Sequence, residues 1–313
     1  MSIAAIAKGL TTFVVPPQWL NRSDGRTHAA RYCYSVFLRH LVHLHNAGTD
    51  TTPRTIAEIG PGASIGTGLA GLIAGAERYH GFDIKAYGSS PQNLAVFDDL
   101  VALFKARAAI PGTNEFTNIK PALETTDFPR HILTDARLSS ALADDRLARL
   151  RALLTSDGMA APDAAISYVA PWFDDTQLLA GSVDWIFSQA VMEHVDDLEA
   201  TYAACRAWLT PGKAMSHQID FKSHGTASTW NGHWAYSDST WRMVRGARGY
   251  LINRAPHSRH RAAMAAAGFE ILEDLRVTRD DGLGRAHLAR PYRDLDDEDL
   301  ITAGAFIVAR TPA

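Results

Sequence analysis

The feature that most constrains this chain is a short apolar run that ends in closely spaced glycines. Residues 55–66 read Thr-Ile-Ala-Glu-Ile-Gly-Pro-Gly-Ala-Ser-Ile-Gly, and a run of small residues follows. This pattern predicts a strand, a tight turn at Gly60 and Gly62, and a helix whose N-terminal amides can hold a polar or anionic ligand. A second predicted strand, 79–84, carries Asp83 near its end, where a carboxylate suits the two hydroxyls of a ribose. The sequence therefore predicts a βαβ unit that binds a nucleoside.

The sequence of the turn argues against a dinucleotide as the bound cofactor. A dinucleotide fingerprint has a third glycine at its sixth position, for close packing of helix on strand, but Ile65 stands there. Glu58 also places a charge in a strand that is usually apolar in dinucleotide-binding proteins. Its carboxylate can bind a cationic α-amino group or the backbone amides of the turn. An acidic residue, Gly-x-Gly and an acid at the end of the next strand resemble motif I and the acidic loop of class I S-adenosylmethionine-dependent methyltransferases.

A second stretch, residues 183–195, strengthens this resemblance. An apolar strand passes there into a polar segment, and Asp196 and Asp197 suit the N-terminus of a following helix. The segment Ser-Gln-Ala-Val-Met-Glu-His-Val is similar to the one that follows the fourth strand in small-molecule methyltransferases of the methyltransferase-11 type. The turn Leu-Thr-Pro-Gly before residue 213 also resembles that family. The resemblance covers roughly residues 55–310.

The resemblance implies an α/β fold, a Rossmann-like doubly wound sheet of about seven strands. Most strands would be parallel, and an antiparallel last strand would be inserted beside the fifth. We expect one methyltransferase domain over 1–313, and residues 269–277 and 301–310 read as its last two strands. Three segments are elaborations: an N-terminal arm and helix (1–50, loosely structured up to about residue 20), a helical insertion (110–162), and an aromatic and histidine-rich loop (222–250). The insertion reads either as a cap near the substrate or as a packed excursion without ligand contact, and 278–299 reads as a solvated excursion.

Composition limits the class of protein. The chain has 313 residues, 46% hydrophobic and 21% charged, with a formal net charge of −3, which suits one large α/β domain. Slight acidity and scattered basic residues argue against nucleic acid as the substrate. No apolar run approaches the ~20 residues of a membrane span, and no secretory signal is expected. Two cysteines without metal-ligand spacing indicate a reducing compartment, so we expect a cytoplasmic protein.

The family resemblance implies a role for each residue of the cofactor site. The residues implied for the methionine half of S-adenosylmethionine are Glu58, Gly60, Pro61, Gly62, Ser64, Ser188 and Gln189. Asp83 would bind the ribose hydroxyls, and Ile84 would pack on the adenine. Trp172, after the third predicted strand, either stacks on the adenine or fills a corner of the core. S-adenosylhomocysteine would be the product.

Catalytic candidates follow the fourth and fifth predicted strands. His194 suits a general base because the unperturbed pKa of histidine lies near ~6.5, although a capping role is an equal alternative. Asp220 and His224 form a second candidate pair, in which the carboxylate orients the ring. Methyl transfer itself mainly requires alignment of the acceptor and exclusion of water.

Candidate acceptor contacts come from the N-terminal helix and the aromatic loop: Tyr32, Trp230, His233 and Trp234. Tryptophans there can also attract the positive sulfonium through cation–π contacts. The alternatives are simple packing for the tyrosine and a small satellite core for the loop.

No metal site is expected. Ubiquinone-pathway O-methyltransferases carry Glu-x-x-Glu-His after the fourth strand and bind a divalent metal there. Here Ala190 replaces the first glutamate, so only Glu193 and His194 remain. The closely spaced His40, His43 and His45 lack an acidic or thiolate partner in their helix and are expected on a wet helix surface.

The prediction is therefore an enzyme, a methyltransferase that uses S-adenosylmethionine and a small-molecule acceptor such as a glycosyl, lipid-linked or specialised metabolite. Oxygen is favoured over nitrogen because histidines surround the site. The alternatives are a catalytically silent S-adenosylmethionine-binding partner protein and an NAD-dependent oxidoreductase. A homodimer is compatible with the sequence.

Overall fold

The computed structural model describes residues 2–15, 26–86, 90–117, 119–155, 164–172, 178 and 180–313, and its central element is a seven-stranded sheet. The strand order is β3-β2-β1-β4-β5-β7-β6. Strand β7 is antiparallel to both β5 and β6, whereas β1 to β5 pair in parallel. The predicted fold class is confirmed, including the last strand inserted beside the fifth. The strands are β1 (Thr55–Ile59), β2 (Arg78–Phe82), β3 (Ile166–Val169), β4 (Val183–Gln189), β5 (Leu209–Asp220), β6 (Glu270–Thr278) and β7 (Thr302–Arg310).

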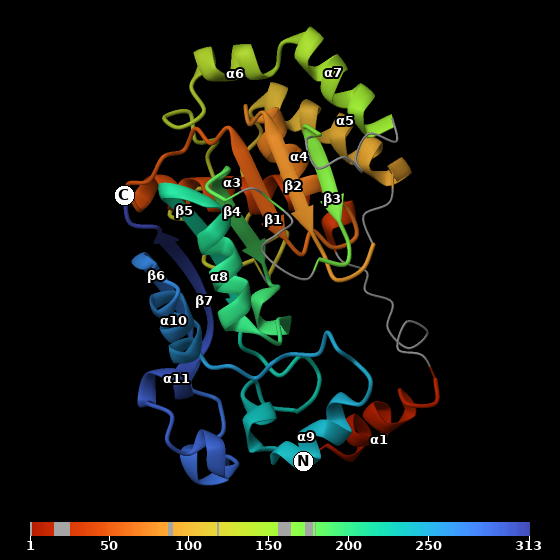
Figure 1. Ribbon diagram of the computed structural model, residues 1–313, viewed down its shortest axis with the longest axis vertical. Helices are drawn as coiled ribbons and strands as arrows, with labels where there is room; N and C mark the ends of the chain where they lie inside the picture. The colour runs from red at the N-terminus through yellow and green to blue at the C-terminus, as the bar shows by residue number, and fades with distance from the viewer. Residues whose placement is uncertain are drawn as a thin grey trace.

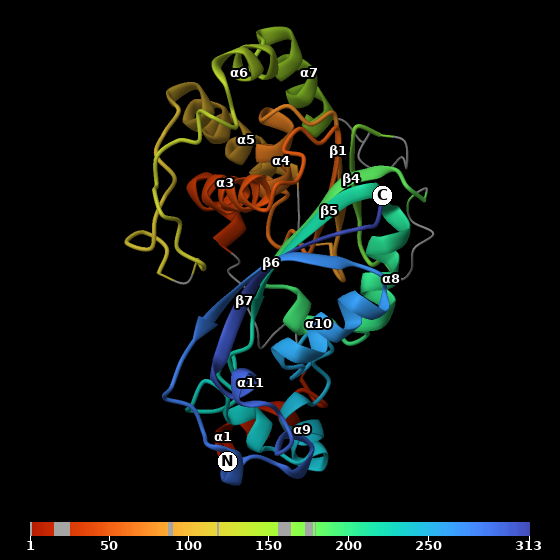
Figure 2. The same cartoon turned by 90° about the vertical axis from the view of Figure 1, so that its left-hand side faces the viewer.

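Helices cover both faces of the sheet, so the central strands are buried on both sides. Figure 2 shows one layer on each side of the sheet. The first layer contains α3 (Ala30–Asn46), α4 (Gly66–Ile73) and α5 (Ser90–Ala106), and the second contains α8 (Leu198–Trp208) and α10 (His257–Ala266). Each helical layer forms a hydrophobic core with the face of the sheet that it covers. Strand β1 contributes to both cores, because alternate side chains point to opposite faces: Ile56 packs in the first core and Ala57 in the second. Asp197 caps α8 as predicted, since its carboxylate accepts from the amide of Ala200 at 2.9 Å.

Helix α4 packs on the sheet through a glycine, which leads to a stability prediction. Gly68→Ala is expected to destabilise the fold by about 1–3 kcal/mol, although alanine normally favours a helix over glycine by ~1 kcal/mol. The added Cβ would lie 1.9 Å from Cε2 of Tyr79, whose ring is fully buried. Urea unfolding measures the effect. Gly284→Ala is the control, since a Cβ there meets nothing within 4 Å; equal losses in the two variants would contradict the argument.

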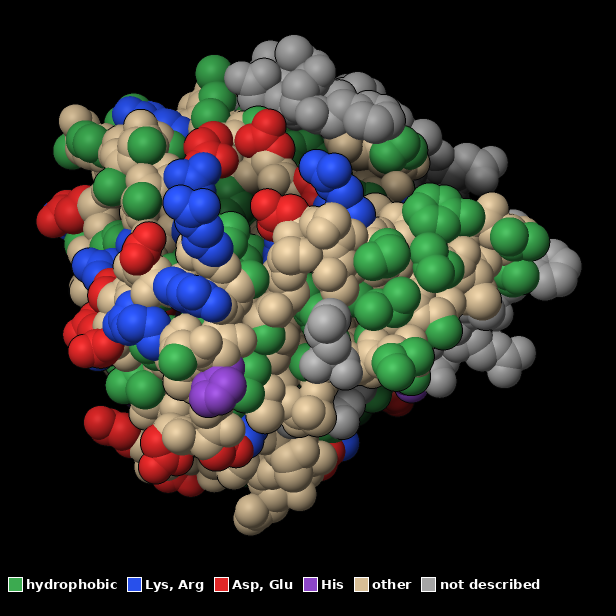
Figure 3. Space-filling model, turned by 90° about the horizontal axis from the view of Figure 1, so that it is seen from below, with side chains coloured by type: hydrophobic (Ala, Val, Ile, Leu, Met, Phe, Trp, Pro, Cys, Tyr) green, Lys and Arg blue, Asp and Glu red, His purple; other side chains and the backbone are tan. Residues whose placement is uncertain are grey.

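The N-terminal arm contains a helix, α1 (Ile3–Thr11), so the expectation of a loose arm up to about residue 20 is wrong for the described residues 2–15. Helix α1 packs on α9 (Asp238–Arg245), where a Cβ at Gly9 would lie only 2.0 Å from the carbonyl oxygen of Met243. Residues 16–25 lie outside the described part. Figure 3 shows charged side chains on one half of this end of the molecule and apolar side chains on the other. Large exposed apolar residues of 2–15 are Ile3, Leu10, Phe13 and Val14.

The predicted insertion forms two helices, α6 (Asp135–Ala141) and α7 (Asp144–Thr155), at the top of Figure 1. The guanidinium of Arg146 donates to the carbonyls of Leu72 and Ala76, both at 2.7 Å. These carbonyls lie at the C-terminal end of α4, which runs back towards the amino ends of the strands. The two helices therefore lie at the edge of the sheet opposite the strand tips where ligands bind in this fold. The loop that precedes α6 contacts α3: Glu115 pairs with Arg31, and the carbonyl of Pro111 accepts from the hydroxyl of Ser35 at 2.7 Å.

A second lobe lies beyond the carboxyl ends of the parallel strands (Figure 1). It contains α1, α9, the short helices η5 (Gly232–Ala235), η6 (Arg285–His287) and η7 (Arg290–Tyr292), and α11 (Asp297–Ile301). Trp230, Trp234 and Leu288 form a small core there, with Tyr292 packed against it. The segment 278–299 is therefore not a simple solvated excursion: its apolar residues anchor the lobe while its charges face water.

Two of the three α3 histidines are buried, contrary to the wet helix surface that was expected, whereas His45 is exposed as expected. His40 places Nδ1 2.8 Å from Oγ of Ser216, and His43 places Nδ1 3.0 Å from a carboxylate oxygen of Glu273. Each histidine has its partner on a strand far along the chain, Ser216 on β5 and Glu273 on β6, which the spacing within the helix could not reveal. Within the described residues no helix has both the length and the apolarity to cross a membrane.

Candidate functional site

The turn after β1 lies against the segment that follows β4. Gly60 and Gly62 adopt φ values of +71° and +76°, which side-chain-bearing residues rarely adopt. A Cβ at Gly60 would lie 2.5 Å from Cγ2 of Val191. Pro61, between the two glycines in sequence, is buried. The two predicted motifs, remote in sequence, therefore meet at the carboxyl edge of the sheet.

Asp83 is held at this edge by the turn itself. Its Oδ2 accepts from the amide of Gly62 at 3.1 Å, and its Oδ1 accepts from the amide of Ile84 at 2.7 Å. Burial raises the pKa of Asp83, whereas the amides of Gly62, Ile84 and Lys85 lower it. Ile84 itself is half exposed beside it. The carboxylate is thus fixed against the glycine turn, where a diol could exchange with these amides.

Glu58 lies inside the first helical layer rather than on the surface. It is 3% exposed, and its Oε2 accepts from the hydroxyl of Tyr79 at 2.8 Å. Burial raises the pKa of Glu58 to about 8, although hydrogen bonds from Tyr79, the amide of Gly68 and the hydroxyl of Thr67 lower it. In this structure the carboxyl group therefore joins β1, β2 and α4.

A residue that the sequence analysis did not predict, Thr27, closes the turn from the other side. It lies in η1 (Arg26–His28), just before α3. The amide of Ser64 donates to Oγ1 of Thr27 at 3.2 Å, and the Ser64 hydroxyl donates to the Thr27 carbonyl. The serine hydroxyl is thus engaged within the protein. No local pattern marks Thr27, because it reaches the turn only through the packing of α3 on α4.

Side chains at the tip of β4 point into the two cores. Ser188 Oγ lies 2.8 Å from Nδ1 of His217, and the Gln189 amide lies between Gln218 and His40 at 3.0 and 3.2 Å. Trp172 is partly buried, with ring centroids 5.9 Å from Phe82 and 5.6 Å from Trp208. These contacts match the core-corner alternative for the tryptophan, while its amide donates to the Asp83 carbonyl at 3.2 Å.

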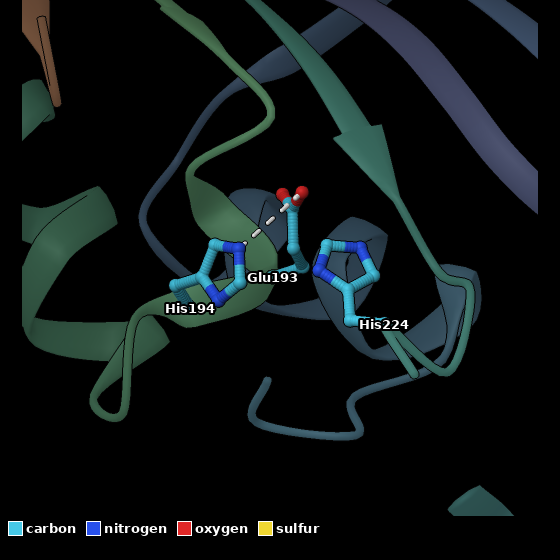
Figure 4. Close-up of side chains that lie close together, drawn as sticks. All are labelled: Glu193, His194 and His224. Carbon is cyan, nitrogen blue, oxygen red and sulfur yellow. Dashed lines mark ion pairs between the residues drawn. The ribbon is translucent and has the colours of Figure 1, made fainter. Parts of the chain in front are cut away.

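The catalytic candidates come together after β4 and β5. His194 ends η4 (Met192–His194), and its ring centroid lies 5.0 Å from that of His224 (Figure 4). Asp220, the last residue of β5, places Oδ2 3.5 Å from Nε2 of His224 and 3.1 Å from Nζ of Lys222. Val191 packs against the glycine turn and directly precedes η4, which ends at His194. The cluster is therefore adjacent to the predicted cofactor site.

Burial and neighbouring charges set the protonation of this cluster. Burial lowers the pKa of His194 to about 4, and the nearby His224 lowers it further. Burial opposes ionisation of Asp220, but His224 and Lys222 outweigh it, so the pKa of Asp220 lies below its usual value. Burial, with the charge of Asp220, raises the pKa of Glu193 well above its usual value. Near neutral pH the cluster therefore holds an ionised Asp220 beside a neutral His194 imidazole.

A pocket of about 320 Å³ opens beside His224. That volume suits part of a small molecule. Its lining combines charge, hydroxyls and one aromatic ring: Asp220, Lys222, Ser223, His224, Gly225, Ser228, Thr229, Trp230 and Arg279. Lys222 and the hydroxyl residues belong to the loop after β5 that was expected to form a pocket wall, although they were not named individually. Arg279 was not predicted, because only the fold brings the end of β6 next to that loop.

The predicted acceptor residues separate into three places. Trp230 lines the pocket and also belongs to the small core of the second lobe. His233 and Trp234 are 1% and 0% exposed, and the indole of Trp234 donates to the Arg254 carbonyl at 2.9 Å. Tyr32 lies on α3 against Phe116, with ring centroids 5.4 Å apart. The structure thus brings only Trp230 to the pocket beside His224.

The order of the strands decides the fold family. A sheet ordered 3-2-1-4-5-7-6 with β7 antiparallel is the arrangement that the sequence resemblance implied. The chain has the fold of the class I S-adenosylmethionine-dependent methyltransferases. No family model matches the sequence, and no curated protein matches it significantly.

Similar solved structures share little sequence with this chain. An S-adenosylmethionine-dependent methyltransferase from Mesorhizobium loti is 16% identical over 82% of this chain and 90% of its own, with a TM-score of 0.38. Geranyl diphosphate C-methyltransferase from Streptomyces coelicolor is 13% identical over 88% and 77%, with a TM-score of 0.44. The [4+2]-cyclase SpnF is 13% identical over 83% and 74%, with a TM-score of 0.39. Function must therefore be argued from this chain's own residues.

Proposed function

We propose that this protein transfers a methyl group from S-adenosylmethionine to an oxygen of a small polar acceptor. One observation carries the proposal: the glycine turn and Asp83 share an edge with the cluster of His194, Asp220 and His224, and Val191 connects the two. Bound along the turn, the cofactor supplies a methyl group on a positively charged sulfur, and loss of that methyl leaves neutral S-adenosylhomocysteine.

The residues of the chain have distinct tasks in this proposal. Asp83 and the amides of the turn bind the ribose, since a carboxylate accepts from two hydroxyls at once. The pocket beside His224 holds the acceptor so that its hydroxyl faces the cofactor edge. The hydroxyl proton leaves to the imidazole of His224, which Asp220 orients and stabilises when protonated. His194 is not assigned as the base, because its lowered pKa reduces its affinity for a proton.

The proposal predicts a specific loss of turnover. His224→Ala and Asp220→Asn are expected to lower kcat about 10²- to 10⁴-fold and to leave the affinity for S-adenosylmethionine unchanged. The measurement is the formation of S-adenosylhomocysteine with a panel of hydroxyl-bearing acceptors, with the methylated product identified by mass spectrometry. His287→Ala, an exposed histidine outside the pocket, is the control.

Other outcomes distinguish the alternatives. Tight cofactor binding without turnover on any acceptor would favour a silent S-adenosylmethionine-binding partner protein. Binding of NAD in place of S-adenosylmethionine would favour an oxidoreductase. Cytoplasmic location and a homodimer remain predictions, and the apolar residues of α1 are the surface to mutate if the protein self-associates.

A further inference from the structure

The buried carboxyl group of Glu193 has no explanation in the structure so far. The residue is 3% exposed, and neither of its carboxylate oxygens has a hydrogen-bond partner of standard geometry among the described residues. A buried polar group without a partner costs free energy, and a buried carboxylate without a counter-charge costs considerably more. A bound cation would provide the counter-charge that an ionised Glu193 lacks.

Two imidazoles face the same point as this carboxylate. Figure 4 shows the side chains of Glu193, His194 and His224 converging between the end of β4 and the loop after β5. Nε2 of His194 lies 4.0 Å from a carboxylate oxygen of Glu193. One potential ligand atom from each of the three residues lies within 4.8 Å of the other two.

We propose that Glu193, His194 and His224 bind one divalent transition-metal ion, with Zn²⁺ the best match. Two nitrogens and one oxygen favour an ion that accepts imidazole, whereas Mg²⁺ and Ca²⁺ prefer oxygen ligands alone. Ligand atoms placed tetrahedrally at ~2.1 Å from Zn²⁺ are about 3.4 Å apart. The three side chains therefore need to approach one another by little more than ~1 Å, which rotations of the two partly exposed imidazoles can supply.

Asp220 completes the surroundings of this site. It lies 3.5 Å from Nε2 of His224, so it can hold that ring in one orientation and leave Nδ1 free for the ion. Lys222 in turn holds Asp220 at 3.1 Å. A carboxylate behind a ligating histidine is a common support in metal sites. The sequence-based expectation of no metal considered only the residues after β4, where Ala190 lacks a ligand; His224, from the loop after β5, provides one instead.

Three protein ligands would leave coordination positions free for another molecule, and the pocket beside them shares His224 with the proposed site. This step rests on the proposed function: an acceptor hydroxyl bound at such a position would lose its proton more readily, because the ion withdraws charge from the oxygen. In the metal-bound protein His224 would hold the ion with His194 instead of accepting the proton, so Asp220 or solvent would take the proton in its place. The acceptor class is thus a molecule that offers an oxygen ligand, a hydroxyl, to a divalent cation.

The test is metal binding by the full-length protein, without any acceptor. Chelator-treated protein is titrated calorimetrically with Zn²⁺, and Co²⁺ substitution reports the ligand geometry through its visible absorption. One ion per chain is expected, with affinity reduced at least ~10- to 100-fold in His224→Ala and in the near-isosteric Glu193→Gln. His131→Ala is the matched control, because His45 and His131 form an exposed pair with ring centroids 4.9 Å apart that could bind metal adventitiously.

Equal affinity of wild type and His224→Ala for Zn²⁺ would overturn the proposal, as would loss of binding only in His131→Ala. Circular dichroism of each variant shows whether it is folded. Titration with S-adenosylmethionine separates the two proposals: cofactor binding by chelator-treated protein tests the cofactor site on which the methyltransferase proposal rests, and Zn²⁺ binding tests the metal site. Either can fail while the other stands.

Discussion

Asp83→Ala is expected to weaken the binding of S-adenosylmethionine about 10- to 100-fold. Hydrogen bonds to a charged group contribute about 1.5–3 kcal/mol, and ~1.4 kcal/mol corresponds to a tenfold change in affinity. The same carboxylate also accepts from the amides of Gly62 and Ile84, so its removal loosens the turn that the cofactor would contact. Isothermal titration of wild type and variant with S-adenosylmethionine, S-adenosylhomocysteine and NAD measures the effect.

Two further variants make this result specific. Asp83→Asn keeps an oxygen that can accept from the turn amides but removes the charge, so its loss of affinity should be intermediate. Asp145→Ala, on α7 at the opposite edge of the sheet, is the control. Unchanged affinity in Asp83→Ala would mean that the cofactor does not lie along this turn. Preferential binding of NAD would mean that Ile65 does not exclude a dinucleotide.

The βαβ unit around Gly60 and Asp83 was predictable because its contacts are local in sequence. A left-handed turn requires glycine, and the end of the next strand is necessarily its neighbour. The segment after β4 was predictable for the same reason, since strand, polar tip and the Asp197 cap follow one another directly. Local patterns thus identified the edge of the sheet where the candidate site lies.

The remaining features depend on contacts between distant segments. Helix α1 is short, and it is stabilised by the close approach of Gly9 to α9, which no nearby residue indicates. His233 and Trp234 resemble residues of a binding loop, yet both are buried, and Trp234 packs in a core with Leu288, far along the chain. The contact between Thr27 and Ser64 likewise exists only once α3 has packed on α4. Periodicity reports which face of an element is apolar, but not which distant element covers it.

Acidification is expected to unfold the protein well before most carboxylates are protonated. Burial lowers the pKa of six described histidines to about 3 or about 4: His40, His80, His194, His217, His233 and His260. At a pH between these pKa values and ~6.5, these histidines are protonated in the unfolded chain but remain neutral in the folded chain. The stability from these groups is therefore fully present above pH ~6.5 and is lost as the pH falls.

Three buried acids act in the opposite direction. The raised pKa values of Glu58, Asp83 and Glu193 mean that the folded chain retains protons that the unfolded chain releases. The contribution of each acid falls as the pH rises above its ordinary pKa, and for Glu58 this fall extends to about pH 8. Below pH 6.5 the histidines outnumber them, and above it the acids act alone. Stability should therefore be greatest near pH 6.5.

The expected loss is on the order of 5 kcal/mol between pH 6.5 and pH 5, since each histidine contributes ~1.4 kcal/mol per pH unit and the acids offset part of the sum. A loss of that size matches the whole stability of many domains. Urea unfolding at pH 5, 6.5 and 8 measures it. His217→Gln should reduce the drop by about 2 kcal/mol, because the uncharged amide cannot take up the proton, whereas the exposed control His287→Gln should leave the profile unchanged. A flat profile from pH 5 to 6.5 would mean that water or movement reaches these histidines, and that the two cores are less tightly packed than the contacts of His40 and His217 indicate.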